Sequence, residues 1–437
     1  MKKTTPQLVL ALCLSALAWL PGAHAADPAL PVLHEPQQTQ APSVYAARRA
    51  ALMRAMGEGV AVIHAEGEED YAGYRPSGDF FYLTGVLEKG AVLVLAPKER
   101  TYQEFLFLPS RDVEAERWTG EREPIAAALR TKYGFDKILR NGALLGTLTG
   151  LAARSPTLWQ VSLPRGGEGK PKDLELYSKV QSRLAGVSVK PMGWKLAQMR
   201  ATHDADELAL MQRSVRITEA GHLAAWQLVR PGVSEAAVRA EAERIWRRSG
   251  SRRNAYDSIV GSGANATILH YPRSERVMQD GELVLMDMAS EYAHYASDIT
   301  RTLPVNGKFS PEQRKIYNLV LQAQQAALAL VKPGVYFEDL DKAARKVIDD
   351  AGYGDYFLHG LGHFVGLDVH DAGAYHEPLK VGMVITLEPG IYIAQKNLGV
   401  RIEDQVVVTE TGARVLSDGL PRSADEVERW MAARLRP

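Results

Sequence analysis

The chain has 437 residues, which exceeds one ordinary domain and is enough for two domains with full hydrophobic cores. Lysine plus arginine and aspartate plus glutamate both number 52, so the formal net charge is zero and the composition predicts neither a nucleic-acid partner nor an acidic-membrane partner. Hydrophobic residues make up 46% of the chain, which is typical of a globular protein.

The first 25 residues have the pattern of a secretory signal peptide. Lys2 and Lys3 precede an apolar run at residues 8–20, and an Ala-His-Ala sequence ends at Ala25. The apolar run is too short to cross a bilayer, which disfavours the alternative of a membrane anchor. We therefore expect cleavage after Ala25, a periplasmic or secreted protein, and no stable membrane span in the mature form.

The single cysteine supports export. Cys13 lies inside the predicted signal peptide, so cleavage would leave a mature chain without any cysteine. Such a chain suits an oxidising compartment, most simply a bacterial periplasm, because it can form neither disulfides nor stray thiol adducts. Residues 26–44 follow; they are rich in Pro, Gln and Ala and are predicted to be a disordered lead-in.

A first α/β domain is predicted over residues 45–190. Apolar runs separated by Gly, Pro and charged residues indicate strands in its first half, and helical patterns follow over residues 111–133. The expected strands lie at residues 60–65, 79–85, 91–97 and 104–109.

From about residue 204 the spacing of apolar residues predicts long amphipathic helices. One pattern covers residues 204–229 and continues over residues 229–246. A second begins at Ser310 and Pro311, where proline suits the first helical position, and continues to residue 348.

The two helical regions belong to an internal repeat. Each carries a basic residue followed by Pro-Gly-Val, at residues 230–233 and 332–335. Downstream, each copy has a glycine and an apolar strand that reaches a carboxylate six positions later, Asp287 in one copy and Glu388 in the other. The offset of 101 or 102 residues predicts two copies of one α/β unit related by a pseudo-twofold axis, with chance similarity as the alternative.

Each copy contributes a second acid, Asp298 in the first and Glu403 in the second. If the copies face each other, four carboxylates converge, and such a cluster is unstable without cations because like charges repel and lose hydration. Two divalent cations would balance four negative charges, and oxygen ligands with one imidazole favour Mn²⁺ over a thiolate-type zinc site. The alternative is that each acid is solvated or paired with a nearby arginine, Arg301 or Arg401.

The imidazole could come from a glycine-rich run at residues 359–371, which holds three of the chain's 11 histidines. His359 and His363 are four residues apart, but no glutamate follows His359 and the intervening glycines disfavour a helix. The run is therefore not the H-E-x-x-H helix of zinc proteases. A core histidine usually occurs alone, so this clustering indicates a functional site.

Five segments of the chain together resemble the pita-bread metallopeptidases, and among them the bacterial aminopeptidases P. These segments are SIVGSGANATILHY, LVLMDMASEYAHYASDITRTLPVNGKF, HGLGHFVGLDVHD, TLEPGIYI and VRIEDQVVVTETG. In the first half, YRPSGDFFYLTG and RDVEAERWTG resemble the family's N-terminal domain, so the resemblance covers about residues 45–420. It implies a mixed α/β (α+β) fold, with a creatinase- or aminopeptidase P-type domain at residues 45–190 and a pita-bread catalytic domain at residues 191–437.

The resemblance also implies the residues of the site. Asp298 and Glu403 would bridge two divalent metal ions, most simply Mn²⁺. The full set of implied metal ligands is Asp287, Asp298, His363, Glu388 and Glu403. The other implied active-site residues are His270, His359, His370 and Arg401.

The activity that the resemblance implies is removal of the first residue from peptides with proline at the second position. A water between the two metal ions would have a lowered pKa and would attack the carbonyl before proline. Glu388 would handle the proton, and His370 with His270 would stabilise the oxyanion. Proline's nitrogen carries no N–H, so recognition would rely on ring shape and apolar walls.

Three alternative functions stay open. A prolidase would use the same ligands but accept only dipeptides. A non-catalytic peptide-binding relative would have lost its metals, and a creatinase-like hydrolase would work without them; the complete ligand set disfavours both. We expect a homo-oligomer, a dimer or a tetramer. The assembly and the preferred peptide length stay open, because Ala289 stands where relatives usually have glycine and because the segments before HGLGHF and before GVRIED are short where some aminopeptidases P have insertions.

Other residues are interpreted as structural or unassigned. Residues 261–266 loosely fit the G-x-G-x-x-A pattern of a dinucleotide-binding loop, but no helix is expected to follow, so we reject that function. His222 lies on a helix face and is expected to be a core or surface residue. Met211 and Trp226 are core candidates, and His294 and His376 have no assigned role.

Overall fold

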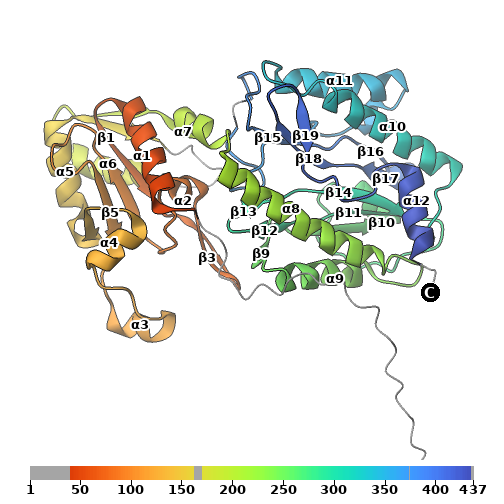
Figure 1. Cartoon of the computed structure of the whole chain (residues 1–437), viewed down its shortest axis with the longest axis horizontal. Coiled ribbons are helices and arrows are strands. Elements are labelled where there is room, and N and C mark those ends of the chain that lie inside the picture. Colours follow the sequence, from red (N-terminus) through yellow and green to blue (C-terminus); the bar gives the residue numbers. More distant parts are fainter. Residues whose placement is uncertain (1–39, 162–169, 374, 435–437) are drawn as a thin grey trace, which may run out of the picture.

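The structure, a computed structural model, describes residues 40–161, 170–373 and 375–434 (Figure 1). The predicted signal peptide and residues 26–39 of the predicted lead-in lie outside these residues, whereas residues 42–44 begin helix α1 (Pro42–Met56), so the prediction of disorder is wrong there. Within the described ranges, no helix is both long enough and apolar enough to cross a membrane. Figure 1 shows a smaller N-terminal part and a larger C-terminal part, joined near helix α7 (Gly193–Arg200).

A six-stranded mixed sheet forms the centre of the N-terminal part, in the order β6-β5-β4-β1-β7-β8. Strand β1 pairs antiparallel with β4 and parallel with β7. A separate hairpin of β2 (Gly67–Asp70) and β3 (Gly73–Pro76) reaches toward the C-terminal part (Figure 1). The sheet strands are β1 (Val60–His64), β4 (Val92–Leu95), β5 (Glu104–Leu108), β6 (Ile138–Arg140), β7 (Thr157–Gln160) and β8 (Ser188–Pro191).

Both faces of this sheet are covered because successive strand residues point to opposite sides. Val60 and Val62 of β1 belong to the core formed with helices α5 (Leu144–Arg154) and α6 (Lys172–Gln181). The intervening Ala61 and Ile63 belong to the core shared with helices α1 and α2. The remaining helices of this part are α1 (Pro42–Met56), α2 (Gly78–Thr84), α3 (Val113–Thr119) and α4 (Ala127–Tyr133).

One predicted strand is wrong. Residues 79–85 were expected to be extended, but they form helix α2. The side chain of Ser77 caps its start by accepting from the backbone N–H of Phe80, and Gly85 ends it in the left-handed region at φ 64°. Because every residue of this short helix is buried, its sequence is apolar without periodicity, and such a run does not distinguish a buried strand from a buried helix. The strands expected at residues 60–65, 91–97 and 104–109 are confirmed as β1, β4 and β5.

The C-terminal part consists of two similar units, as the internal repeat predicts. Each unit has a pair of helices followed by a three-stranded antiparallel sheet. The first unit contains α8 (Ala205–Trp226), α9 (Glu235–Arg248) and the sheet of β10 (Ile259–Ser262), β11 (Leu283–Asp287) and β14 (Thr300–Pro304). The second contains α10 (Pro311–Leu328), α11 (Phe337–Asp350) and the sheet of β15 (Val384–Leu387), β18 (Asp404–Val408) and β19 (Ala413–Val415).

Backbone hydrogen bonds repeat at the same offset and confirm the repeat. Gly232 donates to the carbonyl of Met278 at 2.9 Å, and Gly334 donates to the carbonyl of Leu379 at 2.9 Å. In Figure 1 the two helix pairs lie on opposite sides of the strands that the two units contribute. Shorter elements complete this part: β9 (Arg253–Asn254), β12 (Ser290–Tyr292), β13 (Tyr295–Ala296), β16 (Gly390–Ile393), β17 (Leu398–Arg401) and α12 (Ala424–Ala433).

The core predictions in helix α8 are confirmed. Met211 and Trp226 are fully buried. His222 is also fully buried, and its Nε2 lies 2.8 Å from the carbonyl oxygen of Met288. It is therefore a core histidine with a backbone partner and not part of a site.

Candidate metal centre

The four repeat-related carboxylates lie at the ends of strands that the two units bring together. Asp287 ends β11, and Glu388 directly follows β15. Asp298 lies two residues before β14, and Glu403 directly precedes β18. The backbone N–H of Glu403 donates to the carbonyl of Thr300 at 3.1 Å, which joins the two units at the site.

These acids open onto a cavity of about 660 Å³. All nine residues that the sequence assigned to the site line this one cavity. They are Asp287, Asp298, His363, Glu388 and Glu403, proposed as ligands, and His270, His359, His370 and Arg401, proposed as substrate-facing residues.

His363 faces the carboxylates with the nitrogen that a metal would use. Its Nε2 lies 3.3 Å from Asp298 Oδ2 and 3.4 Å from Glu388 Oε1. Its Nδ1 lies 3.1 Å from the carbonyl oxygen of Phe364 and donates there. Although burial opposes the shift, the carboxylates of Asp298 and Glu388 raise the pKa of His363 to about 9, so Nε2 is protonated in the absence of a cation and would become a ligand on losing that proton. Asp298, His363 and Glu403 can each offer a ligand atom, all within 4.8 Å of one another.

The electrostatics of the cavity favour bound cations. Burial, together with the charge of Asp298, raises the pKa of Glu388 to about 7 and raises the pKa of Glu403 well above its ordinary value. Burial also raises the pKa of Asp287, although Arg401 opposes the shift. Glu403 Oε1 is buried without a hydrogen-bond partner. An orphaned carboxylate oxygen among like charges is costly, and hard divalent cations would remove that cost.

The alternative of acids paired with arginines applies to one of the four. Arg401 donates from Nη2 to Asp287 Oδ2 at 2.5 Å, and from Nη1 to the hydroxyl of Tyr392 at 2.8 Å. The other candidate partner, Arg301, pairs with Asp404, which does not line the cavity. Arg401 therefore compensates part of the negative charge of the cavity, and bound cations would have to compensate the rest.

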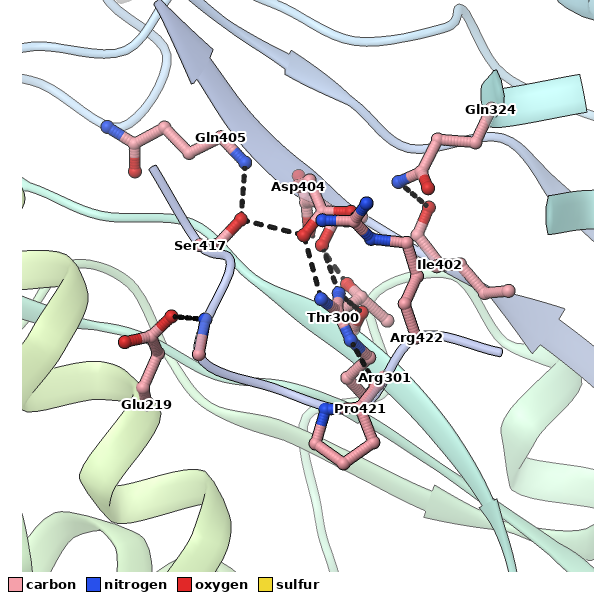
Figure 2. A network of polar contacts seen from close by, with 12 residues as sticks. Glu219, Thr300, Arg301, Gln324, Ile402, Asp404, Gln405, Ser417, Pro421 and Arg422 are labelled. Carbon is pink, nitrogen blue, oxygen red and sulfur yellow. Dashed lines mark hydrogen bonds and ion pairs between the residues drawn. The ribbon is translucent and has the colours of Figure 1, made fainter. Parts of the chain in front are cut away.

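A network of polar contacts surrounds Asp404, the residue that follows Glu403 (Figure 2). Arg301 donates to Asp404 Oδ1 at 2.7 Å and also to the backbone carbonyl of Glu403. Ser417 donates to the same oxygen of Asp404 at 2.7 Å, and Arg422 Nε lies 2.8 Å from the other oxygen. Because Asp404 directly follows Glu403, this network fixes the backbone from which Glu403 reaches the cavity.

The three substrate-facing histidines differ in their surroundings. The ring centroid of His370 lies 4.1 Å from that of His363, and burial together with the charge on His363 lowers the pKa of His370. Burial and Arg401 lower the pKa of His359 to about 4. His270 lines the mouth of the cavity and is exposed.

Four hydroxyl groups at the site were not predicted. The hydroxyl of Tyr256 donates to Asp287 Oδ1, and that of Tyr392 lies 2.8 Å from His359 Nε2. Thr300 donates to Glu403 Oε2 at 2.8 Å, and Thr386 donates to Glu388 Oε1 at 3.3 Å. The sequence held one usable signal, because strand geometry places Thr386 on the same face as a residue two positions later, which is Glu388.

The two histidines without an assigned role lie outside the cavity. His294 has a positive φ of 71°, and its ring centroid lies 4.3 Å from that of Phe81 in the N-terminal part. His376 is exposed and does not line the cavity.

Comparisons with known proteins agree with this architecture. Residues 209–410 match Metallopeptidase family M24, and residues 45–159 match the Aminopeptidase P, N-terminal domain family. The chain is 35% identical over 400 residues to the Xaa-Pro aminopeptidase of Haemophilus influenzae, covering 82% of this chain and 88% of the relative. It is 34% identical over 436 residues to the Xaa-Pro aminopeptidase of Escherichia coli strain K12, covering 88% of this chain and 97% of the relative.

Solved structures give the same result. A variant of Escherichia coli aminopeptidase P in complex with substrate superposes with a TM-score of 0.82 at 33% identity, covering 91% of this chain and 99% of that chain. The Pseudomonas aeruginosa aminopeptidase PepP superposes with a TM-score of 0.82 at 34% identity, covering 90% of this chain and 99% of that chain. A shorter match, 40% identical over 226 residues, is the Xaa-Pro dipeptidase of Pyrococcus furiosus, covering 51% of this chain and 64% of the relative.

The fold and the acidic cavity define a metallopeptidase, a hydrolase of the metallo-aminopeptidase class. The chain belongs to metallopeptidase family M24, the pita-bread metallopeptidases, and is aminopeptidase P-like in both of its parts.

Proposed function

We propose that the protein is an exported Xaa-Pro aminopeptidase that uses two divalent metal ions, Mn²⁺ in the simplest case. The observation that carries this proposal is the single cavity into which all nine sequence-assigned residues converge. Its substrates are peptides with proline at the second position, and its product is the free first residue.

The extent of the matches favours this activity over that of a prolidase. The aminopeptidase relatives match 82% and 88% of the chain, including the N-terminal part. The dipeptidase relative matches 51% of the chain. The N-terminal part is therefore shared over its length with the aminopeptidases, which supports substrates longer than a dipeptide.

The donor set fits two hard cations. The residues that would hold them are Asp287, Asp298, His363, Glu388 and Glu403. When bound, the ions lower the pKa of a coordinated water and supply a nucleophile near neutral pH. The other side chains of the cavity would move the proton, stabilise the oxyanion and orient the peptide.

Glu388 is placed to move the proton of the attacking water. Its carboxylate lies on the cavity wall, Thr386 donates to Oε1, and the backbone beyond it is held by β16. His370 and His270 line the same cavity and would donate to the oxygen of the tetrahedral intermediate. His359 and Arg401 are held together through the hydroxyl of Tyr392 and would orient the peptide.

The cavity also offers apolar walls for a proline ring. Leu269, Pro272, Val369 and Tyr375 line it beside the histidines. A proline nitrogen has no N–H to donate, so selection for proline rests on these walls excluding a polar or extended residue.

The test is hydrolysis by metal-stripped protein, with and without Mn²⁺. The substrates are Xaa-Pro dipeptides and matched Xaa-Pro-Xaa tripeptides and longer peptides. Mn²⁺-dependent release of the first residue from the longer peptides is the expected result. Cleavage of dipeptides alone would make the protein a prolidase, and no cleavage with any divalent metal would leave a peptide-binding protein.

A substitution separates catalysis from folding in the same assay. Glu388→Ala removes the group proposed to move the proton and should abolish turnover while the protein stays folded. Near-normal turnover would refute the assignment of Glu388.

Export and assembly are parts of the proposal that need their own measurements. The sequence pattern of residues 1–25 supports cleavage after Ala25. N-terminal sequencing of the mature protein and fractionation of cells that express the full chain would test both cleavage and a periplasmic or secreted location. Light scattering after size exclusion would distinguish a dimer or tetramer from a monomer.

A further inference from the structure

The loop that carries His370 has no regular secondary structure of its own. Residues 366–372 lie between the site and the N-terminal part and contain no helix or strand. Asp371 supplies internal support: its Oδ2 accepts from the N–H of Leu367 at 2.9 Å, and its own N–H donates to Phe364 at 2.9 Å. Gly366 packs so closely against Asp371 that a Cβ there would collide with the carboxylate.

His370 depends on this loop for its position. The ring of His370 packs against the ring of His363. Among the described residues, no side-chain hydrogen bond fixes the ring of His370. It lies between Asp368 and Asp371 in the sequence, so the placement of these two carboxylates determines the placement of the imidazole.

Both carboxylates are held by arginines that precede the two repeated units, one in the N-terminal part and one in the connecting helix α7. Arg200, at the end of α7, donates to Asp368 Oδ2 at 2.9 Å and also to Asp371 Oδ1. Arg75, in β3, donates to Asp368 Oδ1 at 3.1 Å and also to the carbonyl of Leu367. The loop is thus clamped from the side opposite the cavity.

The two arginines are further anchored on opposite sides of the junction, Arg200 by Asp79 in the N-terminal part and Arg75 by Glu291 in the C-terminal part. Arg200 is 3% exposed, and its Nη1 donates to Asp79 Oδ1 in α2 at 2.7 Å. Gly78 lies against the same guanidinium, where a Cβ would collide with it. Arg75 is anchored by Glu291 at 2.7 Å. Charges held in such surroundings cannot exchange partners freely, because every alternative leaves a buried charge unpaired.

We propose that Arg200, with Arg75, is a positioning residue of the active site that holds His370 in place through Asp368 and Asp371. The described residues that line the cavity all lie between Tyr256 and Glu403, so the N-terminal part contributes no wall of its own. It acts on catalysis through this clamp. The inference rests on the function proposed above for His370.

A double-mutant cycle with His370 tests the clamp. Arg200→Met should lower kcat at least tenfold while KM stays within twofold and the metal content is unchanged, because oxyanion stabilisation acts in the transition state. In a His370→Ala background the same substitution should lower the residual kcat less than twofold, because its effect runs through the removed imidazole. An equal factor in both backgrounds would overturn the proposal.

Two further variants and a matched control complete the test. Arg200→Lys retains the charge and should restore part of the lost kcat. Asp368→Asn breaks the clamp with little change of shape, and it replaces Arg200→Met in the cycle if that variant does not fold. Arg49→Met is the matched control, because Arg49 is also a fully buried arginine paired with a glutamate but touches only the N-terminal part. It should leave kcat unchanged.

Amide hydrogen exchange gives a readout that does not depend on activity. Arg200→Met and Asp368→Asn should speed exchange in residues 366–372, and Arg49→Met should not. Unchanged exchange in the first two would overturn the clamp even in an active enzyme. If the wild-type protein with Mn²⁺ cleaves no Xaa-Pro peptide, the proposed function fails, and the exchange result alone decides whether the loop is held as proposed.

Discussion

The hydroxyl of Tyr392 lies 2.8 Å from Nη1 of Arg401 and joins this arginine to the histidine on its other side. His359 Nε2 lies at the same distance from the hydroxyl, so one phenol oxygen holds two of the proposed substrate-facing residues. Tyr392 is buried in the core, with 3% of the residue exposed. We therefore expect its ring to be structural and its hydroxyl to position the two side chains.

Tyr392→Phe should lower kcat for Xaa-Pro peptides about tenfold, since a factor of ten corresponds to about 1.4 kcal/mol, within the range of about 0.5–1.5 kcal/mol expected for a typical intramolecular hydrogen bond. The measurement is steady-state kinetics beside urea unfolding. Tyr177→Phe is the control: Tyr177 is fully buried and its hydroxyl donates to the carbonyl of Trp159 at 2.8 Å, in the N-terminal part and away from the cavity. It should lose comparable stability without losing kcat. A comparable fall in kcat for both variants would show that the effect is general destabilisation.

His363→Ala should weaken metal binding by more than about 100-fold, because removal of a direct ligand costs more than the 10–100-fold typical of outer-shell partners. Nε2 of His363 is the nitrogen that faces Asp298 and Glu388. Titration calorimetry with Mn²⁺ measures the change. His376→Ala, an exposed histidine outside the cavity, should bind metal as the wild-type protein does. Equal affinity in wild type and His363→Ala would remove His363 from the ligand set.

Metal removal should lower the thermal unfolding temperature. Binding at 1,000 times the dissociation constant adds about 4 kcal/mol to the free energy of unfolding. The repulsion among the buried carboxylates then remains uncompensated. Glu403→Gln sharpens the test, because it removes a buried carboxyl group that must either carry a charge or take up a proton in the metal-free protein. The metal-free variant should unfold at a higher temperature than the metal-free wild type, while Mn²⁺ should stabilise it less. A parallel loss of stability with and without metal would show that Glu403 does not bind the ions.

The sequence predicted that four carboxylates converge because the signal is a spacing and not an isolated residue. Asp287 and Glu388 recur at the offset that also relates the Pro-Gly-Val turns, and the structure repeats the hydrogen bonds of those turns. Strand periodicity likewise located β1, β4 and β5. The assignment of each residue to a catalytic role stays a prediction that the experiments above address.

Other features could not be read from local sequence. The run at residues 79–85 is buried on all sides as helix α2, so it carries no period that would reveal the helix. Arg200 contacts Asp368, 168 positions away in the chain, and Tyr392 contacts His359, 33 positions away. Neither a neutral hydroxyl nor a single arginine has a local pattern that marks it as part of a site.

His222 predicts a defined acid sensitivity. Burial lowers its pKa to about 4, and its Nε2 donates to the carbonyl of Met288 in the neutral form. The unfolded chain takes up this proton near pH 6.5, whereas the folded chain takes it up near 4. The unfolded state therefore binds more protons between these values, and stability falls as the pH is lowered from about 6.5 toward 4.

The expected loss can be isolated with His222→Gln, which keeps a donor near the position of Nε2 but does not titrate. From pH 7 to 4.5 the wild-type protein should lose about 2.5 kcal/mol more of its free energy of unfolding than the variant does. Urea unfolding at both pH values, with chelator present throughout so that metal release does not contribute, measures the difference. Carboxylates and the other buried histidines titrate equally in both proteins and cancel. Equal losses would mean that His222 is already protonated, or reached by water, in the folded protein.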